Sequence, residues 1–227
     1  GSSYAQTTVS ITAAGDSSWN QGNCPTPAIV DFYAYGSATG YLATDSIDVQ
    51  YFFGDGASAT ERVPIWTNSY YSWMQHTYTA PGLYTYMAIA TGPDGKADTL
   101  VRTPGVAVTD TCGNINGKIY LDYNTNCVYD VGVDSLLRYY PLTLSQGGSV
   151  LQWGWSDANG DYVFSAPTGF QYDLSIVNGS ANGYVFACPS SGVLTFTATS
   201  NSTNDLALSC AATGFDLATT ISSWSFR

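Results

Sequence analysis

Hydrophobic and polar residues alternate along most of this chain in short runs. Residues 7–12 (TTVSIT), 28–33 (AIVDFY) and 48–53 (DVQYFF) are typical of these runs. Successive side chains of a β-strand point to opposite faces, so such alternation predicts strands with one buried side. Turn signals rich in Gly, Pro, Asn and Asp separate the runs about every ten residues. The pattern therefore predicts an all-β protein.

The predicted strands fall into two groups. The first group comprises residues 7–12, 28–33, 48–53, 73–78, 83–90 and 99–108, the last interrupted by Pro104-Gly105. The second comprises residues 115–121, 139–144, 150–155, 161–164, 171–176, 184–186, 193–199 and 205–208. Short strands at this spacing are typical of β-sandwiches. We therefore expect two tandem β-sandwiches, over residues 4–110 and 112–211.

The last segment, residues 213–227, begins another alternating run but is too short to form a domain. We expect it to be the first strand of a truncated next module, or a strand added to the second sandwich. The opening Gly1-Ser2-Ser3 resembles a cloning remnant, so we expect the chain to be part of a longer protein whose neighbouring modules are its first partners.

Charge excludes some classes of partner. Only 10% of residues are charged, and the net charge is −11 with a pI near 4.1. An acidic surface repels phosphate backbones, so we expect no nucleic-acid partner. No apolar run is long enough to cross a bilayer, so we expect no membrane insertion in this segment. This composition suits divalent cations and an extracellular setting.

The five cysteines, at positions 24, 112, 127, 188 and 210, form no CxxC pair. With a single His in the chain, disulfides are favoured over a zinc site, which implies an oxidising compartment. Proximity in sequence predicts the pairs Cys112–Cys127 and Cys188–Cys210, with Cys24 left over.

One stretch carries candidate chemistry. Residues 122–134 (DYNTNCVYDVGVD) contain five Asp or Asn residues at nearly alternating positions. Calcium-binding loops place oxygen ligands at positions 1, 3, 5, 7 and 9 and close with an acid near position 12. The candidate ligands here are Asp122, Asn124, Asn126, Val128 through its carbonyl, Asp130 and Asp134. Cys127 stands where Gly is usual, and Asp134 is displaced by one residue. The alternative is a polar turn without a metal.

Catalytic motifs are missing from the sequence. His76 is the only His, so a hydrolytic triad would depend on it, and Glu61 is the only Glu. No P-loop, GxGxxG, HExxH or GxSxG motif occurs. We therefore expect no enzyme activity and assign no catalytic or organic-cofactor residues.

The first half resembles PKD (polycystic kidney disease) domains. The resemblance rests on residues 51–56 (YFFGDG), 76–84 (HTYTAPGLY) and 92–98 (GPDGKAD), and covers about residues 28–108. Tyr51 stands where the family usually has Trp. The resemblance implies an immunoglobulin-like sandwich in which His76 supports a turn rather than catalysis. Asp55 is expected to cap the backbone of its own turn.

The second half resembles the B-type repeats of bacterial adhesins, both the serine-aspartate-repeat and the collagen-adhesin kind. It shares residues 117–130 (GKIYLDYNTNCVYD) and 157–164 (DANGDYVF) with their patterns. In the serine-aspartate-repeat relatives the first loop binds calcium, which implies a structural Ca²⁺ here on the six candidate ligands. Some collagen-adhesin domains carry a Lys–Asn isopeptide bond, but no matching acid and Asn accompany Lys118. Such tandem arrays resemble large secreted surface proteins of Bacteroidetes.

Three functions stay open at this stage. The first is a structural stalk of a bacterial cell-surface protein, stiffened by calcium and disulfides. The second is an adhesion module with a glycan or surface-protein ligand, for which Trp66, Tyr70, Tyr71 and Trp73, and also Trp153 with Trp155, supply aromatic side chains. The third is an accessory region of a secreted hydrolase.

Overall fold

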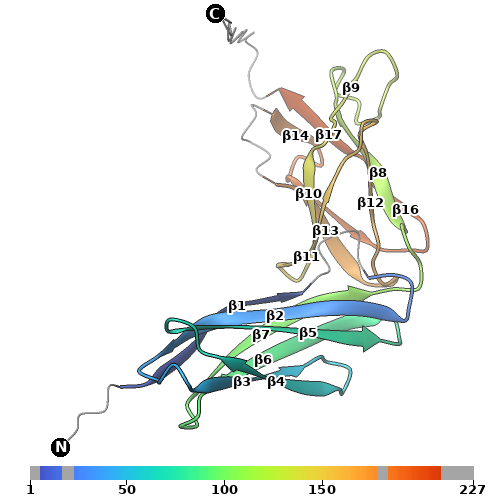
Figure 1. The fold of residues 1–227 in the computed structure, drawn as a ribbon. Coiled ribbons are helices and arrows are strands. Elements are labelled where there is room, and N and C mark those ends of the chain that lie inside the picture. Colours follow the sequence, from blue (N-terminus) through green and yellow to red (C-terminus); the bar gives the residue numbers. More distant parts are fainter. Residues whose placement is uncertain (1–5, 17–22, 178–183, 211–227) are drawn as a thin grey trace, which may run out of the picture.

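The computed structural model describes residues 6–16, 23–177 and 184–210. These residues form strands and no helix, arranged as two β-sandwiches that follow one another along the chain (Figure 1). The all-β prediction of two tandem immunoglobulin-like sandwiches is therefore confirmed. No helix able to span a membrane occurs in the described part of the chain. The strand expected within 213–227 lies outside the described residues.

The first sandwich packs a three-stranded sheet, in the order β1-β2-β5, against a four-stranded sheet, in the order β4-β3-β6-β7. Its strands are β1 (Thr8–Asp16), β2 (Ala28–Thr39), β3 (Ser46–Phe52), β4 (Ser58–Pro64), β5 (Ser69–Tyr78), β6 (Gly82–Thr91) and β7 (Ala97–Val108). All neighbouring strands are antiparallel. Buried aromatic side chains fill the space between the sheets, including Phe32, Tyr51, Phe53, Tyr78 and Tyr86.

Two features of the first sandwich refine the predicted strands. The edge strand β4 was not predicted, because its sequence (SATERVP) is polar and buries mainly Val63. The predicted interruption of the last strand is a bulge within a continuous β7. Tyr84 pairs with Val106 and Tyr86 pairs with Arg102, so residues 103–105 have no partner in the ladder. Proline within a sheet is confined to such bulges and to edges, because it lacks the N–H that a ladder needs.

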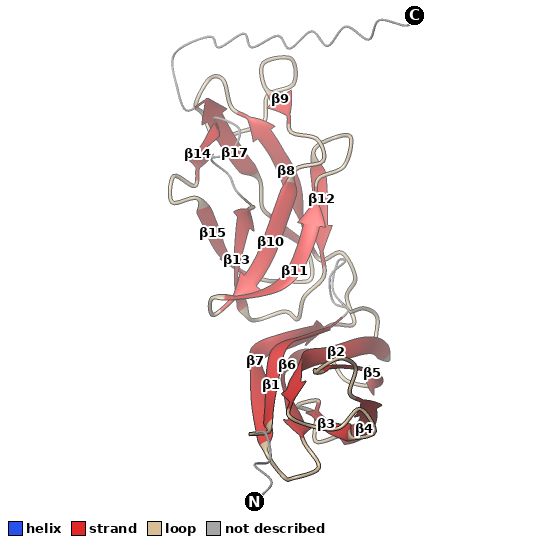
Figure 2. Cartoon of the chain, turned by 60° about the vertical axis from the view of Figure 1, so that its left-hand side comes forward, coloured by secondary structure: helices blue, strands red, loops and turns tan. Residues whose placement is uncertain are grey.

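The second sandwich packs the sheet β11-β10-β13-β15 against a sheet in the order β12-β8-β17-β14 (Figure 2). Its strands are β8 (Ile115–Leu121), β9 (Ser135–Leu136), β10 (Pro141–Gln146), β11 (Ser149–Trp155), β12 (Asp161–Phe164), β13 (Gln171–Ile176), β14 (Tyr184–Cys188), β15 (Val193–Thr197), β16 (Ser202–Thr203) and β17 (Leu206–Cys210). The two-residue strands β9 and β16 both pair with β8 and were not predicted. The central β8 also pairs in parallel with β17, so the first and last strands of this sandwich lie side by side.

The predicted disulfide pairs are wrong. The structure pairs Cys24 with Cys112 and Cys127 with Cys188, and it leaves Cys210 as an exposed free thiol. Sequence proximity failed because β-sheet pairing brings together segments that are far apart in the chain: the bonded cysteines are 88 and 61 residues apart. The general expectation of disulfides is confirmed.

Candidate metal-binding loop and module junction

The Asp/Asn loop joins β8 to β9 and begins at Asp122, whose side chain is 2% exposed. The loop turns sharply at Thr125 (φ 59°) and Cys127 (φ 64°), both in the left-handed region. Calcium loops of this kind usually place Gly at the position of Cys127, because Gly adopts a positive φ without steric cost. The loop therefore makes the expected turn without the expected glycine.

The two end carboxylates of the loop hold its backbone. Asp122 accepts hydrogen bonds from the backbone N–H of Thr125 (2.6 Å) and of Cys127 (2.8 Å). Asp134 accepts from the N–H of Tyr123 (3.0 Å) and of Asp130 (2.8 Å). Asp134, the displaced closing acid, thus ties the end of the loop back to its beginning.

The middle of the loop converges on Asp130. Asn124 and Asn126 each donate a side-chain N–H to the same Asp130 oxygen, Oδ2, at 2.7 Å. These two hydrogen bonds lower the pKa of Asp130. The side-chain oxygens of Asn124 and Asn126 accept the backbone N–H groups of Asn126 (3.2 Å) and Val128 (2.8 Å). Three of the six predicted ligands are therefore joined through the side chain of Asp130.

The donor set fits calcium in its chemistry. All six predicted ligands offer oxygen, and three are carboxylates, as a hard divalent cation prefers. The two amide N–H groups now on Asp130 would have to turn away for a cation to take their place. The loop thus has a self-contained hydrogen-bonded form, and the assignment of calcium stays a prediction.

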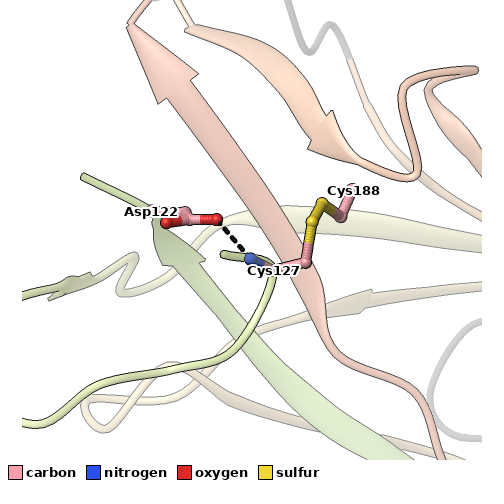
Figure 3. A group of neighbouring side chains, drawn as sticks. All are labelled: Asp122, Cys127 and Cys188. Carbon is pink, nitrogen blue, oxygen red and sulfur yellow. Dashed lines mark hydrogen bonds between the residues drawn. A yellow bond between two sulfur atoms is a disulfide. The ribbon is translucent and has the colours of Figure 1, made fainter. Parts of the chain in front are cut away.

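A different group lies beside Asp122. A carboxylate oxygen of Asp122 and the sulfurs of Cys127 and Cys188 lie within 4.8 Å of one another (Figure 3). Among the described residues, the three predicted carboxylates do not form such a group. Cysteine binds metals as the thiolate, and the disulfide between Cys127 and Cys188 leaves no thiolate on either residue. This bond therefore anchors the loop to β14 instead of completing a metal site.

His76 has the structural role that was expected. Its Nε2 lies 2.7 Å from Asp55 Oδ2, and its ring stacks on Phe53 with centroids 4.0 Å apart. Asp55 also accepts the backbone N–H of Ala57 (3.0 Å) and so caps its own turn. Burial alone would raise the pKa of Asp55, but the hydrogen bonds from His76 and Ala57 outweigh it and lower that pKa.

The aromatic candidates divide between core and surface. Tyr70 is 2% exposed and donates its hydroxyl to the Ser10 carbonyl (3.0 Å), so it belongs to the core. The other members of its predicted cluster are exposed: Trp66 (69%), Tyr71 (58%) and Trp73 (48%). The second predicted group, Trp153 and Trp155 on β11, is also exposed.

The connection between the sandwiches is short and is hydrogen-bonded at both ends. Residues 109–114, here called the junction segment, separate β7 from β8. Buried Asn114 donates to the carbonyls of Ala166 and Thr199 (both 2.9 Å) and accepts the N–H of Ala166 (3.0 Å). At its other end, the N–H of Thr109 donates to the Asn23 carbonyl (3.0 Å). Each end of the segment is therefore fixed to one sandwich.

A disulfide and one buried contact strengthen this connection. Cys24, in the loop before β2, is bonded to Cys112 of the junction segment. Ser165 of the second sandwich reaches this point, because its Oγ accepts the N–H of Gly113 (2.7 Å) and lies 3.7 Å from the Cys24 sulfur. Ala107, at the end of β7, is buried in the hydrophobic core of the second sandwich. Sequence reasoning missed this junction; its only sequence signal is a Cys before β2 and a Cys after β7.

A cleft of about 400 Å³ also lies where the sandwiches meet. One wall comes from β1, β2 and β7 and includes Tyr33 and Arg102, while the other is the β10–β11 hairpin with Trp153. The hairpin is held to the bulge of β7 by a hydrogen bond from Ser149 Oγ to the Thr103 carbonyl (2.9 Å). The two walls are therefore connected directly.

Comparison with known proteins adds little to this picture. No family model matches the chain, and no curated protein matches it, so neither the PKD nor the B-type resemblance is confirmed. Among solved structures, the chain is similar to a minor pilin of Streptococcus agalactiae at 12% identity and a TM-score of 0.32, covering 96% of this chain and 98% of that one. It is also similar to the Bacillus anthracis TIE protein (12% identity, 92% of this chain and 41% of that one, TM-score 0.31). A third similarity is to fibronectin(III)-like modules of Clostridium thermocellum CbhA, at 18% identity and a TM-score of 0.24, covering 87% of this chain and 93% of that one. TM-scores this low carry no argument about function.

Proposed function

We propose that this chain is a non-enzymatic, extracellular spacer of a bacterial surface protein, which holds two sandwiches in a fixed relation. The observation that carries the proposal is the junction. A spacer must resist bending between its modules. Here a short hydrogen-bonded segment, the Cys24–Cys112 disulfide and the burial of Ala107 of β7 in the core of the second sandwich all oppose bending. Linkers that permit motion are instead exposed, flexible and crossed by few contacts.

The chemistry of the chain supports an extracellular setting. Two disulfides form and persist in oxidising compartments. The exposed loops of the second sandwich carry Asp and Asn rather than catalytic groups, and the only His of the chain is engaged in packing and turn support. The resemblance to adhesin repeats agrees with this setting.

Small-angle X-ray scattering tests the fixed relation. The wild-type protein is expected to fit one conformation with a single maximum dimension. The control variant carries a Gly-Ser-Gly-Ser insertion between Cys112 and Gly113, beyond the residue that the disulfide ties to the first sandwich, and it should require an ensemble of conformations. If the wild type needs the same broad ensemble as the insertion variant, the spacer proposal is wrong.

Calcium is the second part of the proposal, bound by Asp122, Asn124, Asn126, Val128, Asp130 and Asp134. An ion that binds only the folded state at a hundred times its dissociation constant stabilises that state by about 2.7 kcal/mol. Adding Ca²⁺ to metal-stripped protein should therefore raise the melting temperature by several degrees. Asp130→Ala should abolish the rise, because Asp130 is the point on which the loop converges.

The matched control for calcium is Asp94→Ala, which removes an exposed carboxylate from the first sandwich. This variant should keep the full calcium response. A melting curve that does not change with Ca²⁺ would reduce residues 122–134 to a polar loop, while leaving the scattering test of the spacer unaffected.

A further inference from the structure

The outer face of the β1-β2-β5 sheet carries an ordered set of aromatic side chains. Tyr33 of β2 pairs directly with Trp73 of β5, and Tyr35 pairs with Tyr71. Directly opposed residues of an antiparallel pair point to the same face, and the next pair on that face lies about 7 Å further along the strands. These four residues are here called the aromatic platform. Three of them are well exposed: Tyr35 (43%), Tyr71 (58%) and Trp73 (48%).

The fold does not use the aromatic platform as core. The alternate residues of the same strands, such as Phe32, Ala34 and Ser72, face inward and are fully buried. An outer face needs no large apolar side chains for stability, and clustered exposed aromatics usually mark a binding surface. A bound ligand therefore accounts for these exposed aromatic side chains better than core packing does.

The turn before β5 adds a further aromatic ring. Trp66 pairs with Ser69 across a two-residue turn, and Ser69 belongs to the outward-facing series of β5. The turn residues Thr67 (φ 49°) and Asn68 (φ 66°) are both left-handed, which is unfavourable for a β-branched Thr. The turn leaves Trp66 at the end of the platform with 69% of its surface exposed.

At its other end the platform enters the cleft between the sandwiches. Tyr33 belongs to both, because it also lines the cleft opposite Trp153. Arg102 is fixed in this cleft by hydrogen bonds from its Nε and Nη2 atoms to the Ala14 carbonyl (3.2 and 3.1 Å). The cleft is also lined by the carboxylate residue Asp16. The exposed aromatic side chains of the platform therefore continue into a cleft that also contains polar side chains.

The chemistry of this surface selects one class of ligand. Flat aromatic rings suit the apolar C–H faces of sugar rings, while a few fixed polar groups orient hydroxyls. The chain's net charge of −11 disfavours anionic polymers such as nucleic acids and uronic-acid glycans. A neutral polysaccharide meets both conditions.

We propose that the aromatic platform and the adjoining cleft together bind a neutral polysaccharide, with sugar rings stacked along Tyr71, Trp73 and Tyr33 and a further sugar placed between Tyr33 and Trp153. This site would give the spacer an adhesive role of its own. It also explains why the cleft needs a fixed junction, because both sandwiches supply its walls.

Affinity electrophoresis of the whole chain in gels containing soluble β-glucan, xylan or mannan tests the proposal. At least one of these neutral polymers should retard the wild type, and polygalacturonate, an anionic control polymer, should not. Trp73→Ala and Trp153→Ala should each weaken binding by about tenfold or more, as expected for aromatic residues central to an interface. Trp73→Ala should still fold, because its backbone N–H is held by Glu61 (2.9 Å) whatever the side chain.

The matched control is Trp155→Ala, which removes an exposed Trp of the same strand as Trp153 that does not line the cleft. It should bind like the wild type. The proposal is overturned if none of the three neutral polymers retards the protein, if Trp155→Ala weakens binding as much as Trp73→Ala, or if polygalacturonate is preferred. A dimer in sedimentation that Trp73→Ala dissociates would also overturn it, because the platform would then be covered by a second copy of the chain.

Discussion

Removal of the Cys24–Cys112 disulfide is expected to destabilise the first sandwich alone. The bond closes a loop with a sequence separation of 88, which contains almost all of that sandwich. A cross-link acts mainly by restricting the unfolded chain, and the effect grows with the logarithm of loop length. For a loop of this size the chain-entropy model gives about 4.5 kcal/mol at 25 °C.

The structure indicates that little else would be lost in the double variant Cys24→Ser/Cys112→Ser. Cys112 is exposed and Cys24 is half-buried, so their removal from the disulfide opens no large core cavity. The expected decrease in the free energy of unfolding is therefore close to the loop term, about 4 to 5 kcal/mol. The contacts around Ser165 should loosen at the same time, since the Cys24 sulfur lies beside its hydroxyl.

Urea denaturation measures this effect, with separate probes for the two sandwiches because two domains need not unfold together. All variants are made in a Cys210→Ser background, which removes the exposed free thiol and prevents disulfide exchange. The matched control is Cys127→Ser/Cys188→Ser, whose loop lies within the second sandwich and should lower only its transition, by about 4 kcal/mol. A loss of less than about 1 kcal/mol in the first sandwich would refute the loop-entropy argument.

Two further predictions concern polar groups in the sandwiches. The pKa of Asp55 is lowered in the folded state, so its contribution to stability is present above its unfolded pKa and is lost as the pH falls through the folded value. The variant Asp55→Asn should therefore flatten the acid limb of a curve of stability against pH, below about pH 4. At pH 7 it should lower the free energy of unfolding by about 1.5 kcal/mol. An unchanged acid limb would show that the bond with His76 does not matter. The buried hydroxyl of Tyr120 has no hydrogen-bond partner among the described residues, whereas the Tyr172 hydroxyl donates to the Pro167 carbonyl (3.0 Å). Burial raises the pKa of Tyr120 to about 12. Tyr120→Phe should therefore be neutral or stabilising and Tyr172→Phe should cost about 1 kcal/mol in urea melts, an order that equal losses would contradict.

Much of the strand pattern could be predicted from the sequence, because it depends on neighbouring residues. Period-two alternation located most of the strands, and the predicted strands 161–164 and 171–176 coincide with β12 and β13. The predicted strands 139–144 and 150–155 are joined by a turn at Gly147-Gly148, and both glycines have the positive φ that such hairpin turns require (58° and 82°). The role of His76 followed from its place in a motif, and its stacking on Phe53 agrees with that.

Pairings between distant residues could not be predicted in this way. The disulfides, the two-residue strands β9 and β16 and the polar edge strand β4 all depend on partners brought together by the sheets. The junction is of the same kind, because Asn114 is satisfied by residues 52 and 85 positions away. Its sequence is an ordinary Gly/Asn turn, and only the folded chain brings these partners to it.

For the candidate sites, the sequence determined the chemistry and the tertiary structure decided its placement. The recurrence of Asp and Asn in residues 122–134 predicts oxygen ligands, but only the fold shows that the side chains of Asn124 and Asn126 both contact Asp130. Alternation likewise says that Tyr70 and Tyr71 face opposite ways, but not which way is inward. The structure buries Tyr70 and exposes Tyr71, because the inner face of a sheet is defined only when a second sheet packs against it.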